Sequence, residues 1–200
     1  MGKIFYVMGK SSSGKDTIYR ELLRESDTED LKAIVPYTTR PIRVGKREGR
    51  EYHFVQEEDF QRLLAQGKVI EHREYQTFHG IWRYFMVDDG QIAIEEKQNY
   101  ILIGTLEGYA SIKQYFGADR VAPILIELDD GVRLQRALNR ERKQEHPKYQ
   151  EMCRRFLADS EDFAEDKIIA AGIHRRFQND NLKQCLAEIS DYIFSGDQPK

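Results

Sequence analysis

The stretch that decides the fold is Gly9-Lys10-Ser11-Ser12-Ser13-Gly14-Lys15-Asp16-Thr17. It follows a short apolar run, Ile4–Met8, and precedes a helix-like segment at residues 17–23. Two glycines separated by four residues, with a lysine directly after the second, form the pattern of a phosphate-binding loop. In such a loop, backbone N–H groups and the N-terminus of the next helix converge on polyphosphate. The order therefore predicts a strand, a nucleotide-phosphate loop and a helix, with Lys15 beside the β- and γ-phosphates.

One position of this loop departs from the strict pattern. The residue after the lysine is normally Ser or Thr, whose hydroxyl binds Mg²⁺, and here it is Asp16. The hydroxyl comes one residue later, at Thr17. Both side chains are candidate Mg²⁺ ligands, because this hard cation prefers oxygen. An acidic residue in the first turn of a helix is equally expected from the helix dipole alone. The pattern leaves both interpretations of Asp16 open.

Composition limits the protein to a few classes. The chain has 200 residues, is 40% hydrophobic and 32% charged, and carries a net charge of −3, which predicts a single domain with its own core. This charge balance gives no general attraction to nucleic acid. No segment approaches the roughly 20 apolar residues of a membrane span. Cys153 and Cys185 lie in helix-like apolar patterns typical of small core residues, which favours a reducing cytoplasm. Together these observations lead us to expect a cytoplasmic protein without nucleic-acid or membrane partners.

Apolar periodicity predicts an α/β fold. Strand-like runs alternate with helical repeats, which is the pattern of a parallel sheet between two layers of helices, a three-layer P-loop NTPase arrangement. The predicted strands are Ile4–Met8, Ala33–Tyr37, Tyr100–Gly104 and Val121–Leu128. Helical periodicity covers residues 57–66, 106–116 and 181–194. Another helix is expected after Asp129, with Leu134, Ala137 and Leu138 on its inner face.

Residues 40–84 depart from this alternation and predict a small mixed insert. Arg40 and Arg43 lie three residues apart, and Tyr52 follows behind two glycine-containing turns. Guanidinium groups bind phosphate through two parallel hydrogen bonds, and a phenol adds a directional one. The three side chains therefore predict a second anion site opposite the first loop. The alternative is a solvated basic loop, because the lysines and arginines here are interleaved with glutamates.

The two phosphate-binding patterns together resemble the guanylate kinase family of P-loop nucleoside monophosphate kinases. Family members carry the loop near the N-terminus, then Thr-Thr-Arg-x-x-Arg-x-Gly, then Gly-x-x-Tyr-x-Phe. This sequence matches both motifs at Thr38, Thr39, Arg40, Arg43, Gly45, Gly49, Tyr52 and Phe54. The resemblance covers most of the chain and implies three parts: a core (1–39, 85–138 and 165–195), an acceptor-binding insert (40–84) and a lid (139–164).

The resemblance also implies roles for individual residues. Donor ATP is bound by Gly9, Ser11, Ser12, Ser13, Gly14, Lys15, Asp16 and Thr17, and by Asn179 of an Asn-Asp pair that meets adenine. The acceptor is bound by Thr39, Arg40, Arg43, Tyr52, Glu71, His79 and Thr105, with Glu71 facing guanine. The catalytic cations are Lys15, Arg40, Arg155 and the lid residues Arg140 or Arg142.

These residues fit the demands of phosphoryl transfer. The reaction needs the γ-phosphate of the donor and an oxygen of the acceptor held in line. It also needs cations to offset the charge that spreads over the equatorial oxygens. Arginines and Mg²⁺ supply those cations, and an acceptor phosphate is already ionised, so no general base is required. We therefore expect an ATP- and Mg²⁺-dependent kinase.

The acceptor side departs from the family pattern at several positions. Lys46 stands where the family has glutamate, His79 replaces a phosphate-binding tyrosine, and Thr105 replaces an acid. Changes of polar partners weaken a site commonly by about 10²-fold. GMP or a similar nucleoside monophosphate is the first expected acceptor. The second is another phosphorylated molecule such as ribose 1,5-bisphosphate, whose guanylate kinase-like enzyme also has a Gly-Lys-Asp loop. A non-catalytic binding module is the third, and the intact Lys15 argues against it.

Overall fold

The core of the protein is a five-stranded parallel sheet. The structure is a computed structural model that describes residues 2–25, 31–43, 45–77, 80–93, 95 and 97–194. All neighbouring strands of this sheet run parallel. In order across the sheet they are β2 (Leu31–Ala33), β7 (Asn99–Ile103), β1 (Ile4–Met8), β8 (Val121–Glu127) and β9 (Arg176–Gln178). The predicted α/β class is confirmed.

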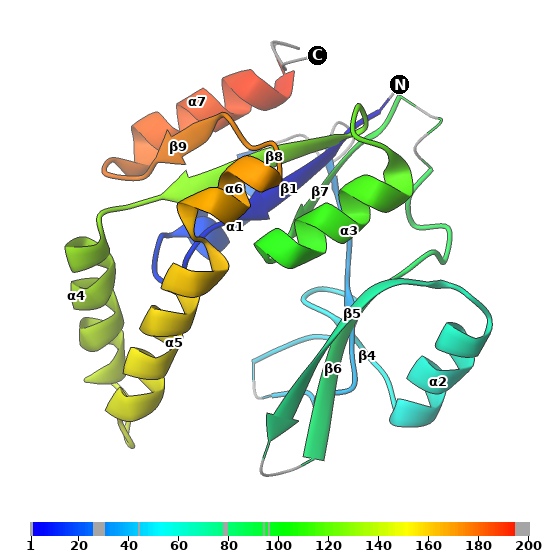
Figure 1. The fold of residues 1–200 in the computed structure, drawn as a ribbon, viewed down its shortest axis with the longest axis horizontal. Helices are drawn as coiled ribbons and strands as arrows, with labels where there is room; N and C mark the ends of the chain where they lie inside the picture. The colour runs from blue at the N-terminus through cyan, green and yellow to red at the C-terminus, as the bar shows by residue number, and fades with distance from the viewer. Residues whose placement is uncertain are drawn as a thin grey trace.

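Helices cover both faces of this sheet (Figure 1). On one face, α1 (Lys15–Glu25) and α7 (Leu182–Phe194) pack on Phe5 and Val7 of β1. On the other face, α3 (Leu106–Phe116) and α6 (Glu165–Ala170) pack on the alternate residues of the same strand. Every residue of β1 is buried, because successive side chains of a strand point to opposite faces and both faces are covered.

A second, four-stranded sheet forms a smaller layer below the core. Its order is β4 (His53–Phe54), β3 (Tyr37–Thr38), β6 (Gly80–Val87) and β5 (Val69–Thr77). Strands β5 and β6 pair antiparallel, and α2 (Glu57–Ala65) packs its one buried residue, Phe60, against this sheet. The rings of Phe60 and Phe85 lie 4.9 Å apart edge to face and form a separate small core.

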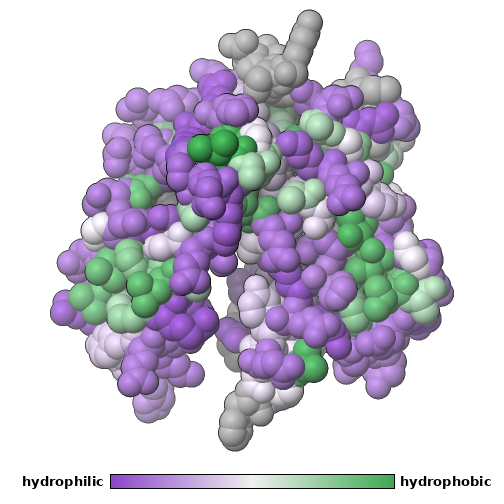
Figure 2. All heavy atoms as spheres, in the orientation of Figure 1, coloured by the Kyte–Doolittle hydropathy of each residue, from purple (hydrophilic) through white to green (hydrophobic). Residues whose placement is uncertain are grey.

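Two helices extend from the core toward the lower left in Figure 1, and the second sheet lies to their right. They are α4 (Asp130–Glu141) and α5 (Tyr149–Asp162), which pack against each other. In the space-filling view, a gap flanked by polar side chains separates this helical pair from the second sheet (Figure 2). Among the described residues, no helix is both long and apolar enough to cross a membrane.

The strand predicted at residues 33–37 is wrong in its extent. The structure divides this stretch between β2, which ends at Ala33, and β3, which begins at Tyr37 in the other sheet. Ile34 still donates its N–H to Ile101 in the core sheet, at 2.9 Å. Pro36 has no N–H to continue the ladder, and the chain leaves the first sheet there.

Two further expectations about burial are corrected. Leu134, expected on the inner face of α4, is 40% exposed, whereas Arg133 is 1% exposed. This helix packs on α5 and on the loop after β1 rather than on the core sheet. The side chain that contacts both of them is Arg133, which pairs with Asp159 of α5 and donates to the Ser11 carbonyl. Cys185 is buried as expected, but Cys153 is exposed on α5, because that helix has no buried residue.

Candidate active site

The loop after β1 is held tightly by its surroundings. A Cβ on Gly9 would lie 2.4 Å from the carbonyl oxygen of Ile126, so only glycine fits beneath the loop. Gly14 has φ +97°, and a Cβ there would lie 2.2 Å from Nδ2 of Asn179. Ser12 adopts a left-handed backbone with φ 64°, a conformation that costs free energy in a residue other than glycine. Such strain is typical of functional loops.

Several buried polar atoms of this loop have no hydrogen-bond partner among the described residues. They are Oγ of Ser12, Oγ of Ser13 and Oδ1 of the neighbouring Asn179. Buried polar groups are normally satisfied, so a cluster of unsatisfied ones indicates a missing polar ligand. Helix α1 begins at Lys15, directly after the loop, and directs its N-terminus toward the same place. The loop therefore has the features of an anion-binding site.

Lys15, Asp16 and Thr17 follow at the start of α1. The Lys15 ammonium lies 3.7 Å from Oδ2 of Asp16, and the side chain of Asp16 is 79% exposed. Thr17 is half-buried. The described residues contain no cluster of three or more His, Cys, Asp or Glu that suits a metal ion. Mg²⁺ bound here would take the Asp16 carboxylate and the Thr17 hydroxyl from the protein and its other ligands from phosphate and water, which is its usual mode.

The helical pair is anchored to this loop by a buried ion pair that the sequence analysis missed. Asp159 of α5 accepts hydrogen bonds from the Ser11 N–H at 2.8 Å and the Ser11 hydroxyl at 3.2 Å. Arg133 of α4 donates to the Ser11 carbonyl and to Asp159, both at 3.0 Å, and also pairs with Asp130. The guanidinium also stacks 4.9 Å from the ring of Phe156. These contacts explain the burial of Arg133.

On the second sheet, Arg40 and Tyr52 form a cationic and aromatic cluster. Arg40 donates to the Tyr84 hydroxyl at 3.0 Å, and its guanidinium lies 5.7 Å from the ring centres of both Tyr52 and Tyr84. Its Nε is buried without a hydrogen-bond partner. Burial raises the pKa of Tyr52, while the charges of Arg40 and Arg73 act to lower it. The phenol therefore stays protonated and able to donate at neutral pH.

Arg43 and Thr39 lie on either side of this cluster. Arg43 is exposed, with its guanidinium 5.6 Å from the ring centre of Trp82. The Thr39 hydroxyl accepts from the Arg83 N–H at 2.9 Å, and the Thr39 N–H donates to the Arg83 carbonyl. The Thr39 hydroxyl oxygen thus supports the sheet, whereas Arg43 faces outward.

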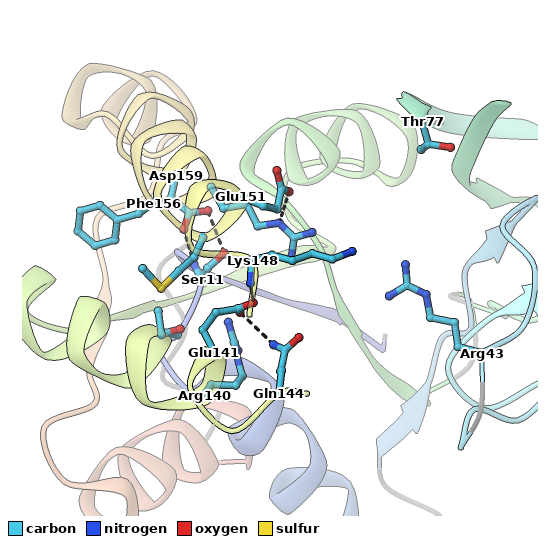
Figure 3. A pocket seen from close by; sticks show the side chains of 14 residues that line it. Ser11, Arg43, Thr77, Arg140, Glu141, Gln144, Lys148, Glu151, Phe156 and Asp159 are labelled. Carbon is cyan, nitrogen blue, oxygen red and sulfur yellow. Dashed lines mark hydrogen bonds and ion pairs between the residues drawn. The ribbon is translucent and has the colours of Figure 1, made fainter. Parts of the chain in front are cut away.

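A cavity of about 610 Å³ lies between the loop, the second sheet and the helical pair (Figure 3), and Lys15, Arg40 and Tyr52 are not among its lining residues. Ser11 and Ser12 line it from the loop, Arg43 and Thr77 from the second sheet, and the remaining lining residues come from α4, α5 and their connection. Figure 3 shows Arg43 on one side of this space and Lys148, a residue that the sequence analysis missed, on the other. Two cationic regions therefore face each other across a single cavity.

Comparison with known proteins agrees with this architecture. The family model described as guanylate kinase matches residues 1–83. The guanylate kinase of Clostridioides difficile is 32% identical over 114 residues, which cover 56% of this chain and 53% of that protein. The guanylate kinase of Caulobacter vibrioides is 27% identical over 197 residues, covering 98% of this chain and 78% of that protein. The chain is similar in sequence to guanylate kinases.

A solved structure supports the same conclusion at the level of fold. The crystal structure of guanylate kinase from Anaplasma phagocytophilum superposes with a TM-score of 0.67 at 20% sequence identity, covering 100% of this chain and 87% of that one. The segment matched in the Clostridioides protein spans about half of that protein's length. The likeness in fold therefore extends over the whole of this chain. The sequence match to the Clostridioides protein covers only about half of it.

The three arginines predicted to act from the lid differ in their position relative to the cavity. Arg140 and Arg155 line the 610 Å³ cavity, and Arg142 is not among its lining residues. Arg142 lies at the C-terminal end of α4, where it is exposed. Arg155 donates through Nε to Glu151 at 2.7 Å, and hydrogen bonds from Arg154 and Arg155 lower the pKa of Glu151 to about 2. Arg155 is therefore paired with a carboxylate in this conformation.

Asn179 lies beneath the loop rather than beside open space. It is 3% exposed, and its Nδ2 donates to the Ser13 carbonyl at 2.7 Å. Its backbone N–H donates to the carbonyl of Glu127 at 2.9 Å. In this conformation Asn179 supports the phosphate loop, and its contact with adenine stays a prediction.

The two positions assigned to the base are joined by a residue that the sequence analysis missed. Arg73 lies 3.3 Å from the Glu71 carboxylate through Nε and donates to the Thr105 hydroxyl oxygen at 3.1 Å through Nη1. Burial raises the pKa of Glu71, and the charge of Arg73 opposes this shift. His79, the remaining acceptor residue of the prediction, lies outside the described residues. No motif marked Arg73, because its role depends on two partners that are distant in sequence.

Proposed function

We propose that this guanylate kinase relative catalyses ATP-dependent phosphoryl transfer to a phosphorylated small molecule, with GMP as the leading acceptor, giving ADP and GDP. The observation that carries the proposal is the 610 Å³ cavity, which is lined by the phosphate loop on one side and by Arg43 and Thr77 on the other. A non-catalytic binding module has no need of a donor loop that faces its acceptor site. In this proposal the core binds the donor, the insert binds the acceptor, and the lid supplies further positive charge.

The donor site consists of the loop and the start of α1. The free hydroxyls of Ser12 and Ser13 and the N-terminus of α1 receive the phosphates of ATP. Lys15 neutralises charge on the β- and γ-phosphates. Asp16 and Thr17 are the residues that would hold Mg²⁺, and the bound ion would neutralise charge on the transferring phosphoryl group.

The acceptor phosphate is bound by Arg40, Arg43 and Tyr52. Its oxygen is ionised at neutral pH, so it attacks the γ-phosphorus directly. The new P–O bond forms as the bond to the β,γ-bridging oxygen breaks, and ADP leaves with that electron pair. Positioning by the guanidinium groups lowers the barrier, because the two reacting groups no longer have to meet by diffusion.

The lid supplies the remaining positive charge and excludes water. Arg140 and Arg155 line the cavity on this side, and Arg142 lies two residues after Arg140. Arg155 is held by Glu151, so its guanidinium must exchange that carboxylate for the transferring phosphoryl group when both substrates are bound. This exchange makes its charge available only in the occupied site.

One observation favours a second acceptor. Arg73 occupies the carboxylate of Glu71, which the resemblance assigns to guanine. A phosphorylated sugar such as ribose 1,5-bisphosphate does not need that carboxylate. GMP and the sugar bisphosphate are therefore the two acceptors to compare.

A turnover screen tests the proposal. The purified protein is incubated with ATP, Mg²⁺ and a panel of monophosphates and sugar phosphates, and ADP release is measured. ADP formed only with GMP or another nucleotide selects the first acceptor class, and ADP formed with ribose 1,5-bisphosphate selects the second. If no acceptor releases ADP above the background hydrolysis of ATP, the kinase proposal is wrong and a binding module is favoured.

A further inference from the structure

Arg73 spans the space between the second sheet and the core. Glu71 and Arg73 are alternate residues of β5 and lie on the same face of that strand. Arg73 donates to Thr105, the N-cap residue of α3, at 3.1 Å, while its Nε and Nη2 lie 3.3 and 3.5 Å from the two carboxylate oxygens of Glu71. The guanidinium therefore bridges two elements that are distant in sequence.

This bridge takes up the acceptor atoms on either side of it. The side chain of Glu71 is 7% exposed, and both of its oxygens face Arg73. The Thr105 hydroxyl oxygen already accepts from the Gly108 N–H at 3.2 Å and from Arg73, so its two lone pairs are used. A purine that offers N–H donors, as guanine does, must therefore compete with the Arg73 guanidinium for the Glu71 carboxylate and finds no free lone pair on the Thr105 hydroxyl.

Arg73 itself keeps donors for a ligand. A guanidinium carries five N–H groups. One from Nη1 goes to Thr105, and one each from Nε and Nη2 face Glu71, which leaves one on Nη1 and one on Nη2. The side chain is 20% exposed and lines a cavity of about 510 Å³, together with Tyr75, Thr105 and Lys167. Oxygen atoms of a ligand can accept these remaining hydrogen bonds.

A row of aromatic rings links this cavity to the site proposed for the acceptor phosphate. The rings of Tyr75 and Tyr84 are 5.5 Å apart, and those of Tyr84 and Tyr52 are also 5.5 Å apart. Arg40 donates to the Tyr84 hydroxyl, and its guanidinium lies 5.7 Å from the ring centres of both Tyr52 and Tyr84. An acceptor bound through its phosphate at Arg40 thus extends along the rings toward Arg73.

We propose that Arg73 sets the acceptor specificity of this protein, closing the space between Glu71 and Thr105 to guanine and binding oxygen acceptors on the distal part of the acceptor molecule. The inference rests on the proposed function and, of its two acceptor classes, favours the sugar phosphates over GMP: phosphorylated molecules with hydroxyl or phosphate oxygens at the end remote from the phosphate held by Arg40. Arg73 is a specificity residue here, and it takes no part in the transfer of the phosphoryl group.

The test compares affinities for two probes without ATP, so that it does not depend on turnover. Isothermal titration calorimetry measures GMP and ribose 1,5-bisphosphate binding to the wild type, Arg73→Ala, and the double variant Arg73→Ala/Glu71→Gln. Removing Arg73 frees the Glu71 carboxylate for guanine and removes donors from the sugar probe. The ratio of GMP affinity to sugar affinity is expected to rise by about 100-fold in Arg73→Ala. The double variant should lose the gain in GMP affinity, because the freed carboxylate is gone.

Arg62→Ala is the matched control. Arg62 is an exposed arginine of α2 that pairs with Asp59 at 2.8 Å, remote from both cavities. It should leave the affinity ratio at the wild-type value, and thermal melting of each variant verifies folding. The proposal is overturned if the ratio in Arg73→Ala stays within about tenfold of wild type, or if Glu71→Gln fails to reverse the gain. A failure of ATP turnover with every acceptor, by contrast, rejects only the kinase proposal.

Discussion

The two anion-binding regions of this molecule are held in opposite ways. In the loop at residues 9–17, Ser13 is fully buried, and Gly9 and Gly14 pack against the Ile126 carbonyl and Asn179. In the basic segment of the second sheet, Arg43 and residues 45–50 are exposed, and the Arg43 guanidinium lies over the ring of Trp82. One site is fixed by packing and the other faces solvent.

This difference indicates which of the two sites can change between kinases and which can stay the same. A triphosphate is the same in every ATP molecule, so a rigid, buried loop can match it in advance without a loss of generality. The acceptor differs from one kinase to another, and exposed side chains on a sheet are easily changed without disturbing a core. We therefore expect acceptor specificity to be concentrated on the second sheet, where Glu71 and Arg73 lie.

The largest expected effect is that of Lys15→Ala on the donor side. This change removes a cation beside the transferring phosphoryl group, so kcat is expected to fall by roughly 10³-fold. ADP release at saturating ATP and acceptor measures it. Lys183→Ala, at an exposed position of α7, is the control and should retain wild-type turnover. Retention of more than a tenth of the activity in Lys15→Ala would remove the lysine from the proposed mechanism.

The next effect concerns the attachment of the lid to the loop. Asp159→Ala leaves the buried Arg133 with Asp130 as its one remaining carboxylate partner among the described residues, so the free energy of unfolding is expected to fall by about 3 kcal/mol. Urea denaturation measures the change. Arg62→Ala, which breaks the exposed pair with Asp59, should cost less than about 0.5 kcal/mol. An equal loss of unfolding free energy in the two variants would show that the Asp159 contacts contribute no more stability than an exposed ion pair.

A smaller effect is expected from Arg43→Ala on the exposed side. Loss of one charged hydrogen-bonding partner of the acceptor phosphate should raise the acceptor KM by roughly 30-fold and leave the ATP KM unchanged. Initial rates over a matrix of both substrates separate the two constants. Arg47→Ala changes a neighbouring basic residue that does not line the cavity, and it provides the comparison. An unchanged acceptor KM in Arg43→Ala contradicts the assigned pocket.

The smallest effect is expected from Asp16→Ser. If Asp16 takes part in Mg²⁺ binding, directly or through water, the Mg²⁺ concentration for half-maximal rate should rise about threefold, because phosphate and water supply the other ligands. Titration of Mg²⁺ at fixed ATP measures it. Asp16 is 79% exposed, so the change should not alter the melting temperature. An unaltered Mg²⁺ titration means that the aspartate only favours the helix N-terminus.

Much of the architecture could be read from local sequence patterns. Strand β1 is confirmed at Ile4–Met8, and α3 is confirmed at Leu106–Phe116. Both have an uninterrupted apolar pattern and a clear boundary, the glycine loop in one case and the Thr105 cap in the other. The predicted strand at 33–37 failed, because a short apolar run carries no information about which of two sheets receives it.

The candidate site divides in the same way. Gly14, Lys15, Arg40 and Arg43 belong to contiguous motifs, so their presence in a phosphate site could be proposed from spacing alone. Arg73, Arg133 and Asp159 belong to no motif, and each acts through a partner that is distant in the chain. Arg133 looks like an ordinary helix-surface charge until α5 and the loop are placed against it.

The sequence by itself determined the order of strand, phosphate loop and helix, and the residue types able to bind anions, because these follow from spacing along a few residues. Only the tertiary structure decided which charges face a cavity and which are neutralised by another side chain. The reason is physical: a guanidinium is exposed or paired according to its spatial neighbours. Arg43 remains open to a ligand, whereas Arg133 is closed within a buried ion pair.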